Sequence, residues 1–416
     1  MTISNMTLDS YPILTLAERE RRWSRTRKLI EESQLDALIV FGLKGRERYE
    51  GYLSNESIDG VVVFPASGEP IYLTWTHHRV SRRLTETMRD VTFWIDDVRV
   101  GLFGPLLVNV ITELKLQESR VGVVGLDSKA PSEMEGLIAY RTWEAVLKGL
   151  PSVEFVEMTV PFSMMMLVKS EEELALIRFA SLIGEKACQV MLDVTRPGVR
   201  EADIFAAVME VIHSHSAVSV APHLIMSVGA DDVGWAPPYW NYAGGRSRLV
   251  RPGDLVQAEI FPCYGGVETQ MQMSVAVEPV PSILHELNDV ARRSYEAGLS
   301  MAKPGVRFQA LAEAMAEPVR QAGCWTLTPM VHSVTPVCLV GHIGINIDQA
   351  PIISGYRGVR TLPPLNDRVL EAGIPIAFEP NACRGLHRVN IGGTVVVQDG
   401  APLELNRIPV HMHVVR

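Results

Sequence analysis

Glu259, His342 and Glu379 are the candidate proton-transfer groups of this 416-residue sequence: their side-chain types suit that role, and the sequence blocks quoted below single them out. His342 is the first candidate for a proton shuttle, because the unperturbed pKa of histidine lies near physiological pH. A core histidine whose ring is satisfied by backbone groups is the alternative. Glu259 and Glu379 can hold an amidinium or a ring N–H, and either becomes a general base if burial raises its pKa.

Polar side chains of two expected strands are candidates for substrate contacts. Residues 255–264 predict a strand, and in a regular strand positions 259, 261 and 263 share a face. Cys263 is therefore expected beside Glu259, either as a nucleophile or, more commonly for such a thiol, as an inert buried side chain. Gln270 and Gln272 share a face of the next strand and can donate amide N–H groups to a polar substrate.

An aromatic and proline-rich loop precedes the first of these strands and contains Trp235, Trp240 and Tyr242. Such a loop suits stacking on a planar or cationic ligand. A rigid lid or a dimer contact is the alternative. His332, which leads into the segment around His342, is expected to approach the same site.

The elements that position these residues form two domains. Residues 1–163 predict an α/β domain, with helices at 17–32 and 131–147 and strands at 35–41, 60–65, 70–75 and 120–125. Residues 164–416 begin with Ser170, which can cap a helix that runs toward Met191. This second domain is predicted to be α+β, with further helices at 201–213, 285–303 and 308–322 and strands at 255–264, 270–280, 374–379 and 393–398.

The composition excludes several classes of protein. A net charge of -9, a pI near 5.7 and the lack of a clustered basic face argue against a nucleic-acid partner. The polar N-terminus is unlike a signal peptide, and no apolar run reaches membrane-spanning length, which predicts a cytoplasmic protein without a membrane partner. Five cysteines without CxxC spacing are typical of reduced thiols and not of a structural zinc site.

Four separated blocks of sequence resemble the pita-bread family, which includes methionine aminopeptidase, prolidase, aminopeptidase P and creatinase. They read RPGDLVQAEIFPCYGG, VGHIGINIDQAP, PIAFEP and GGTVVVQDG, in the family's order. The segment RYEGYLSNE resembles the creatinase-type N-terminal domain. The resemblance spans nearly the whole chain and implies a creatinase-type α/β domain followed by an α+β pita-bread catalytic domain.

The resemblance also implies where metal ligands would lie. The family's metallopeptidases hold two divalent ions with two Asp, one His and two Glu. The corresponding residues here are Glu259, Gln270, His342, Glu379 and Gly392. A neutral amide and a glycine remove much of the negative charge that two cations need, so no metal site and no cofactor are predicted. A single ion held by the three ionisable residues is the alternative.

The metal-independent member creatinase is the best resemblance, with three departures, one of which is Gln272 in place of a glutamate that holds the substrate. The position of the creatinase histidine is occupied by Tyr242, and the loop from which creatinase lends an arginine to its partner subunit offers Glu56 and Asp59 instead. If this loop reaches across a homodimer, the substrate is expected to carry an amine, amidine or ring nitrogen. Solvated loop charges are the alternative.

These observations predict a metal-independent hydrolase of a small nitrogen compound, similar to creatinase and the ectoine-opening hydrolases. His342, Glu259 and Glu379 are its expected catalytic residues. A metal-dependent Xaa-Pro dipeptidase or aminopeptidase P-like peptidase, a lyase on the same fold, and a binding protein without catalysis are the alternatives.

Overall fold

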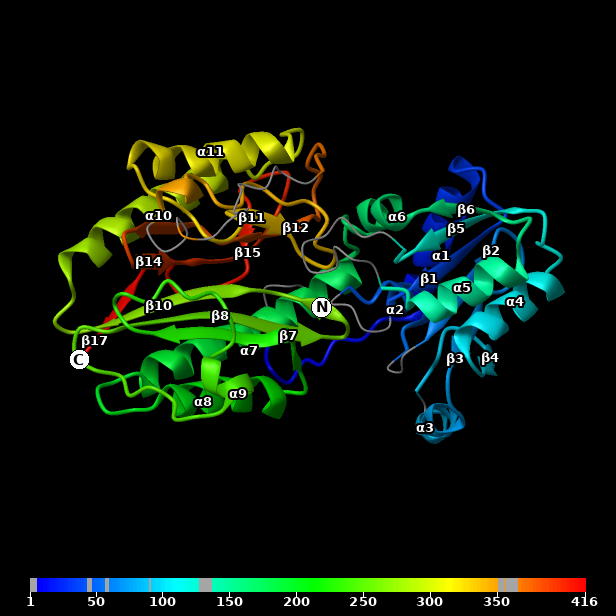
Figure 1. Cartoon of the computed structure of the whole chain (residues 1–416), viewed down its shortest axis with the longest axis horizontal. Coiled ribbons are helices and arrows are strands. Elements are labelled where there is room, and N and C mark those ends of the chain that lie inside the picture. The colour runs from blue at the N-terminus through cyan, green and yellow to red at the C-terminus, as the bar shows by residue number, and fades with distance from the viewer. Residues whose placement is uncertain are drawn as a thin grey trace. The chain divides into compact units, whose positions relative to one another are not determined.

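The chain divides into two compact units. The computed structural model describes residues 6–42, 47–56, 60–89, 91–126, 137–350, 355 and 366–416, and Figure 1 shows both units. One unit is Leu14–Met166. The other is formed by Leu167–Arg416 together with the N-terminal segment Met1–Ile13.

The unit Leu14–Met166 is built on a six-stranded mixed sheet in the order β4-β3-β2-β1-β5-β6. Its strands are β1 (Ala37–Phe41), β2 (Val61–Pro65), β3 (Ile71–Thr74), β4 (Asp97–Val100), β5 (Arg120–Val124) and β6 (Glu154–Glu157). The expected hairpin is confirmed, because β2 and β3 pair antiparallel. Its helices are α1 (Leu16–Glu32), α2 (Tyr49–Ser54), α3 (His77–Thr87), α4 (Phe103–Glu113), α5 (Tyr140–Gly149) and α6 (Thr159–Met166).

Both faces of this sheet are apolar. Leu38 and Val40 of β1 pack in one cluster with Trp23 of α1, whereas Ile39 packs on the opposite face with Leu107 of α4. Alternate residues of a strand point to opposite faces, so a continuous apolar run such as Ala37–Phe41 is buried on both sides. The predicted helix at 131–147 is α5, which begins at Tyr140; residues 131–136 lie outside the described residues.

The second unit contains a nine-stranded, mostly antiparallel sheet with the main order β11-β12-β15-β10-β8-β7. Its strands are β7 (Val218–Val228), β8 (Leu255–Tyr264), β9 (Val267–Glu268), β10 (Met271–Val277), β11 (Val331–Ser333), β12 (Pro375–Phe378), β15 (Gly392–Val396), β16 (Leu403–Glu404) and β17 (His413–Val415). A separate hairpin is formed by β13 (Asn381–Arg384) and β14 (His387–Asn390).

Two helix pairs flank these strands (Figure 1). The pair α7 (Glu171–Val194) and α8 (Glu201–Ser214) packs on β7, β8 and β10. The pair α10 (Ser282–Met301) and α11 (Phe308–Gln321) packs with β14. The short helices α9 (Tyr239–Ala243) and η3 (Ile347–Gln349) lie in the connections. The predicted start of α7 is confirmed: Ser170 and Glu173 form a reciprocal capping box.

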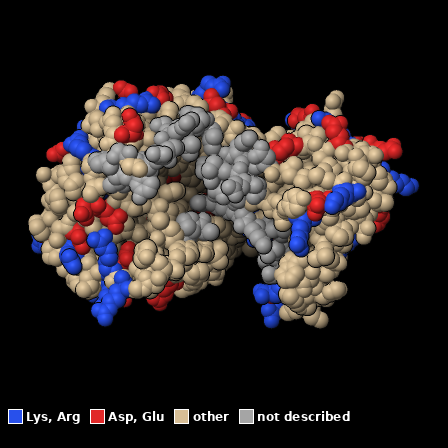
Figure 2. Space-filling view, viewed as in Figure 1, with Lys and Arg blue, Asp and Glu red and all other residues tan. Residues whose placement is uncertain are grey.

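Two further features of the structure are the distribution of surface charge and the hydropathy of the helices. Basic and acidic side chains are interspersed on the face shown in Figure 2. Within the described residues, no helix is both long and apolar enough to span a membrane.

Candidate functional site

The site is centred on Glu259, a buried carboxylate in the middle of β8. Antiparallel pairing places Ile225 of β7 on one side of it and Gln272 of β10 on the other. Its Oε1 accepts hydrogen bonds from Trp235 Nε1 at 2.8 Å and from Asn390 Nδ2 at 3.0 Å. Burial, together with the nearby Glu379 carboxylate, raises the pKa of Glu259 to about 7 against the opposing effects of Arg388 and Trp235. Glu259 can therefore both take up and release a proton near neutral pH.

A buried guanidinium lies beside this carboxylate. Arg388 belongs to β14, and its Nη2 is 3.6 Å from Glu259 Oε1. Its Nη1 donates to the carbonyl oxygen of Gly234 at 3.4 Å. Asn390, two residues further along the strand, is anchored by two hydrogen bonds between its backbone and the hydroxyl of Ser274. The hairpin thus holds a fixed positive charge against the centre of the sheet.

A second proton-transfer pair is formed by His332 of β11 and Glu379, which directly follows β12. His332 Nε2 and Glu379 Oε1 are 2.6 Å apart, and His332 Nδ1 is 2.8 Å from the carbonyl oxygen of Ser333. A carbonyl oxygen only accepts, so Nδ1 carries a hydrogen. One further proton is then shared between Nε2 and the carboxylate, and the pair is neutral overall wherever that proton resides.

A chain of polar side chains borders the site along β10. Gln270 Nε2 donates to Glu268 Oε1 at 2.7 Å, and Gln272 Nε2 donates to Gln270 Oε1 at 3.2 Å. The predicted shared face of the two glutamines is therefore observed. Each amide nitrogen donates one of its two hydrogens to a protein acceptor, so the role of these glutamines as donors to a substrate stays a prediction. Gln272 also presents a buried Oε1 without a hydrogen-bond partner in the described structure.

A small cavity lies next to Glu259 and Arg388; it is partly open to solvent and has room for about one water molecule. Its lining contains several buried polar atoms that have no hydrogen-bond partner among the described residues: Ser227 Oγ, Gln257 Oε1, Asn390 Oδ1 and Arg388 Nε and Nη2. We call this space the Arg388 cavity. Polar atoms left unpaired in a buried site are costly to folding, and a water molecule or a small ligand group in this cavity would pair them.

The residues present do not fit the pair of divalent ions expected of metal-binding relatives. Gly392 has a φ of 150°, and a Cβ there would lie 1.8 Å from the carbonyl oxygen of Phe378, so no glutamate can occupy this position in this backbone. The amide of Gln270 is bound to Glu268. The Arg388 guanidinium would also repel a cation beside Glu259. Within the described ranges, no group of three His, Cys, Asp or Glu side chains is arranged to hold a metal.

The side chain of His342 pairs with a different carboxylate, that of Glu313, and its predicted place with Glu259 and Glu379 stays a prediction. Its Nε2 lies 2.7 Å from Glu313 Oε2 of α11, a side chain that is 55% exposed. His332 contacts Glu379 instead, because the antiparallel pairing of β11 with β12 sets it opposite Ala377, two residues from that glutamate.

The aromatic loop is divided between different partners. Trp235 reaches Glu259, as described above. Trp240 donates its Nε1 hydrogen to Glu201 on α8 at 2.8 Å and packs edge-on against Phe205, and its predicted contact with a substrate stays a prediction. Tyr242 is 72% exposed and lies outside the lining of the Arg388 cavity.

Two other predicted substrate contacts are not among the residues that line the Arg388 cavity. Cys263 is near the end of β8, opposite Val218 and Glu268, and does not line the cavity. Glu56 is buried in the other unit, where its carboxylate pairs with Arg83 Nε at 2.9 Å, and its contribution to the site of a partner subunit stays a prediction. Asp59 lies outside the described residues. The homodimer itself stays a prediction.

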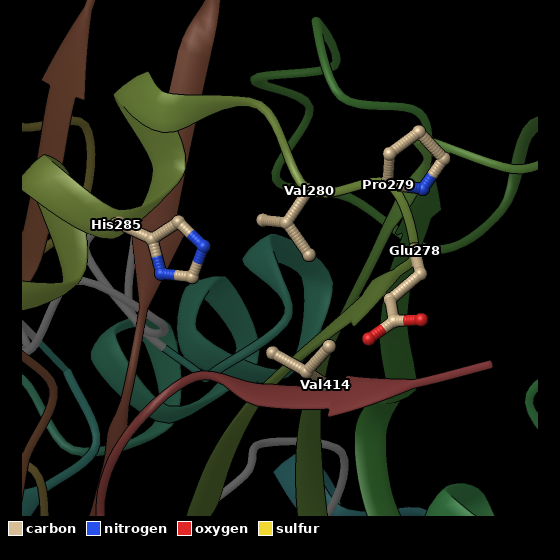
Figure 3. A pocket seen from close by; sticks show the side chains of 5 residues that line it. All are labelled: Glu278, Pro279, Val280, His285 and Val414. Atoms are coloured by element: carbon tan, nitrogen blue, oxygen red, sulfur yellow. The ribbon is translucent and has the colours of Figure 1, made fainter.

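A second hollow does not have the features of a site. It is an open depression lined by Glu278, Pro279, Val280, His285 and Val414, as Figure 3 shows. The carboxylate of Glu278 lies 3.6 Å from Nε of Arg416, with which it forms an ion pair. Its lining contains neither a buried acid–base pair nor a buried cation, in contrast to the surroundings of Glu259.

Sequence reasoning missed Arg388, Asn390, Ser227 and Gln257. The signal for Arg388 and Asn390 is their alternation on a strand just before GGTVVVQDG, and the signal for Gln257 is its shared face with Glu259. Neither signal identifies a buried site unless the strand pairing is known.

Comparisons with known proteins agree with the predicted two-domain fold. A model of metallopeptidase family M24 matches residues 175–399. The uncharacterised hydrolase/peptidase y4tL of Sinorhizobium fredii is 24% identical over 324 residues, 74% of this chain and 77% of the relative. The Xaa-Pro dipeptidase of Pyrococcus furiosus is 22% identical over 280 residues, 66% of this chain and 73% of that enzyme. The crystal structure of dipeptidase PepE from Mycobacterium ulcerans has a TM-score of 0.72 at 20% identity and covers 97% of this chain and 99% of its own.

Proposed function

Because the chain belongs to metallopeptidase family M24, we propose that it is a hydrolase that cleaves an amide-type C–N bond of a small substrate without a pair of metal ions. The observation that supports this most is the buried pair of Arg388 and Glu259, in which a fixed cation stands 3.6 Å from the carboxylate. The resemblance of the sequence to creatinase predicted a small nitrogen compound, such as a guanidino compound, as the substrate. The relatives are mainly peptidases and favour a peptide-like amide over a guanidino compound.

The side chains supply the proton transfers that such a hydrolysis needs. In this proposal, Glu259 takes one proton from a water molecule as the water oxygen bonds to the substrate carbon. The shared proton of His332 and Glu379 moves to the nitrogen as the C–N bond breaks. The two groups begin in the required states, because Glu259 is partly ionised at neutral pH and the pair holds one mobile proton.

A metal-dependent Xaa-Pro dipeptidase is the second candidate. The names of the Pyrococcus enzyme and of the Mycobacterium structure favour it. Against it stand the missing ligand at Gly392 and the cation at Arg388. The two candidates differ in what a chelator does to the enzyme.

The test is a turnover screen in metal-depleted buffer, with Xaa-Pro dipeptides, other dipeptides, lactams and guanidino compounds as substrates. Each is run with a chelator, without it, and with added Mn²⁺ or Zn²⁺, and metal content is measured by elemental analysis. Turnover that survives the chelator and is lost in Glu259→Gln supports the proposal. Turnover that requires added metal, with two ions per chain, overturns it in favour of the dipeptidase.

A further inference from the structure

Trp235 reaches the buried carboxylate of Glu259 from the loop that precedes β8. Its Nε1 donates to Glu259 Oε1 at 2.8 Å, although the indole as a whole is 42% exposed. Asn390 Nδ2 donates to the same oxygen at 3.0 Å. Within the described residues, both hydrogen bonds of this carboxylate therefore end on Oε1, and one of them comes from a residue that also faces solvent.

The two donors decide which oxygen of Glu259 can take up a proton. A carboxylate oxygen has about two lone-pair sites, and Trp235 and Asn390 occupy both sites of Oε1. The indole N–H only donates, so a proton on Oε1 would break one of these bonds inside a buried site, which is costly. Oε2 accepts no hydrogen bond from the described residues, and it is not among the fully enclosed unpaired atoms. Oε2 is therefore the oxygen that is open to a proton.

A short strap, residues 230–235, holds the indole in this position. Carbonyl groups at alternate positions of the strap accept from side chains of the sheet and the hairpin: Ala230 from His387 Nδ1 at 2.7 Å, Asp232 from Gln257 Nε2 at 3.1 Å and Gly234 from Arg388 Nη1 at 3.4 Å. The strand β14 thus fixes the residue before Trp235 and, through Asn390, supplies the second donor to Glu259. The two donors cannot move independently of each other.

We propose that Trp235 is a positioning residue of the hydrolase: its indole N–H, held by the strap, fixes Oε1 of Glu259 so that Oε2 takes the proton from the attacking water. The water oxygen bonds to the substrate carbon, and the nitrogen leaves with the proton of the His332–Glu379 pair. This inference rests on the proposed function, because it assigns the reacting atom of that enzyme's base. It also replaces the expectation that Trp235 stacks on a ligand.

The first test follows the indole N–H signals of the full chain by NMR, with isotope-labelled tryptophan, as the pH is changed. The chain has seven tryptophans, and the signal of Trp235 is the one that Trp235→Phe removes. This signal should move with a midpoint near the Glu259 pKa of about 7. The movement should vanish in Glu259→Gln, whose amide oxygen still accepts but does not titrate. This comparison holds even if Trp235→Phe folds poorly.

The same experiment reports which oxygen carries the proton. If the proton goes to Oε2, the indole hydrogen bond to Oε1 survives protonation of Glu259. The indole hydrogen of Trp235 should therefore stay protected from exchange with solvent below the midpoint. Free exchange below the midpoint would show that the proton displaces the indole from Oε1.

The second test measures the titration of Glu259 itself, as the infrared band of a protonated carboxyl that Glu259→Gln lacks. Trp235→Phe keeps an aromatic ring but loses the donor. The midpoint should rise by roughly one pH unit, because a hydrogen bond to a charged group is stronger than one to a neutral group. Trp240→Phe is the matched control: it removes an indole N–H from the same loop that donates to Glu201 at 2.8 Å, and it should leave the Glu259 midpoint unchanged.

Kinetics on a substrate from the chelator screen distinguish positioning from substrate contact. In Trp235→Phe, the acid limb of kcat/KM should move to higher pH by the same amount as the infrared midpoint. At the pH optimum, kcat should fall roughly 10-fold at nearly constant KM, because the base is less well oriented. A rise in KM at unchanged kcat would show that the indole contacts the substrate and would overturn the inference.

Three spectroscopic results would also overturn it: a Trp235 signal that does not follow Glu259, free exchange of its hydrogen below the midpoint, or an unchanged infrared midpoint in Trp235→Phe. Chelator-resistant turnover together with any of these results would leave the proposed hydrolase standing and remove the role of Trp235. The expected spectra without any turnover would remove the hydrolase and leave Trp235 as the residue that selects the protonated oxygen of Glu259.

Discussion

The charge state of Glu259 makes a quantitative prediction about stability. The pKa of this carboxyl rises from 4.5 to about 7 on folding, chiefly because burial disfavours the charged form. The folded protein therefore holds the proton more tightly than the unfolded chain does. The resulting stabilisation is complete below pH 4.5 and is lost as the pH rises through 7. At about 1.4 kcal/mol per pKa unit, the contribution is about 3 kcal/mol.

Glu259→Gln removes this pH dependence. A glutamine keeps an acceptor for Trp235 and Asn390 but does not titrate. The free energy of unfolding of the variant relative to wild type should therefore increase by about 3 kcal/mol between pH 4.5 and pH 8. For a unit of this size the change corresponds to roughly 6–12 °C in Tm.

The assay is differential scanning calorimetry of both proteins at several pH values, with the transition assigned to the unit that contains β8. Other buried carboxyls with raised pKa values, such as Glu50 in the other unit, change both proteins equally and cancel in the difference. Glu210→Gln, at an exposed position on α8, is the control and should show no pH-dependent difference. A flat difference for Glu259→Gln from pH 4.5 to 8 would refute the claim that burial sets this carboxyl's pKa.

Three further predictions concern other residues. Gly392→Ala should destabilise the protein by about 3 kcal/mol or more, because its Cβ would meet the Phe378 carbonyl oxygen; Gly400→Ala, with no neighbour within 4 Å, is the control, and equal denaturation midpoints would contradict the clash. Ser170→Ala should cost about 1 kcal/mol in a urea titration, because it removes the side-chain half of the α7 capping box. Glu379→Gln keeps a hydrogen bond to His332 but cannot transfer a proton, so kcat should fall roughly 100-fold or more while Tm changes little. An unchanged kcat would exclude the His332–Glu379 pair from proton transfer.

Local patterns were sufficient for much of the fold and for part of the site. Ser170 and Glu173 lie three residues apart, and their capping box forms as the spacing predicts. The alternation of β10 places Gln270 and Gln272 on one face, as expected. Such features depend on a few neighbouring residues, so they can be predicted without knowledge of the tertiary structure.

The choice between two histidines could not be made in this way. His332 and His342 are both near the same block, and only the pairing of β11 with β12 brings the first to Glu379. The second lies beside Glu313 of α11, a helix that is distant in sequence. Arg388 was missed for a similar reason, because an arginine next to a hairpin turn is usually exposed. Its burial follows from the packing of the hairpin against the sheet.

Gly392 and Arg388 affect the charge of the site in the same direction. In a site that holds two cations, each anionic ligand offsets part of the ion charge; the backbone around Gly392 leaves no room for one of these ligands. The Arg388 guanidinium, 3.6 Å from Glu259, supplies one positive charge that is covalently fixed and cannot be removed by a chelator. With the His332–Glu379 pair neutral, the site carries a net charge of +1 when Glu259 is protonated and zero when it is ionised. A charge balance of this kind favours one anionic group of a ligand over two divalent ions.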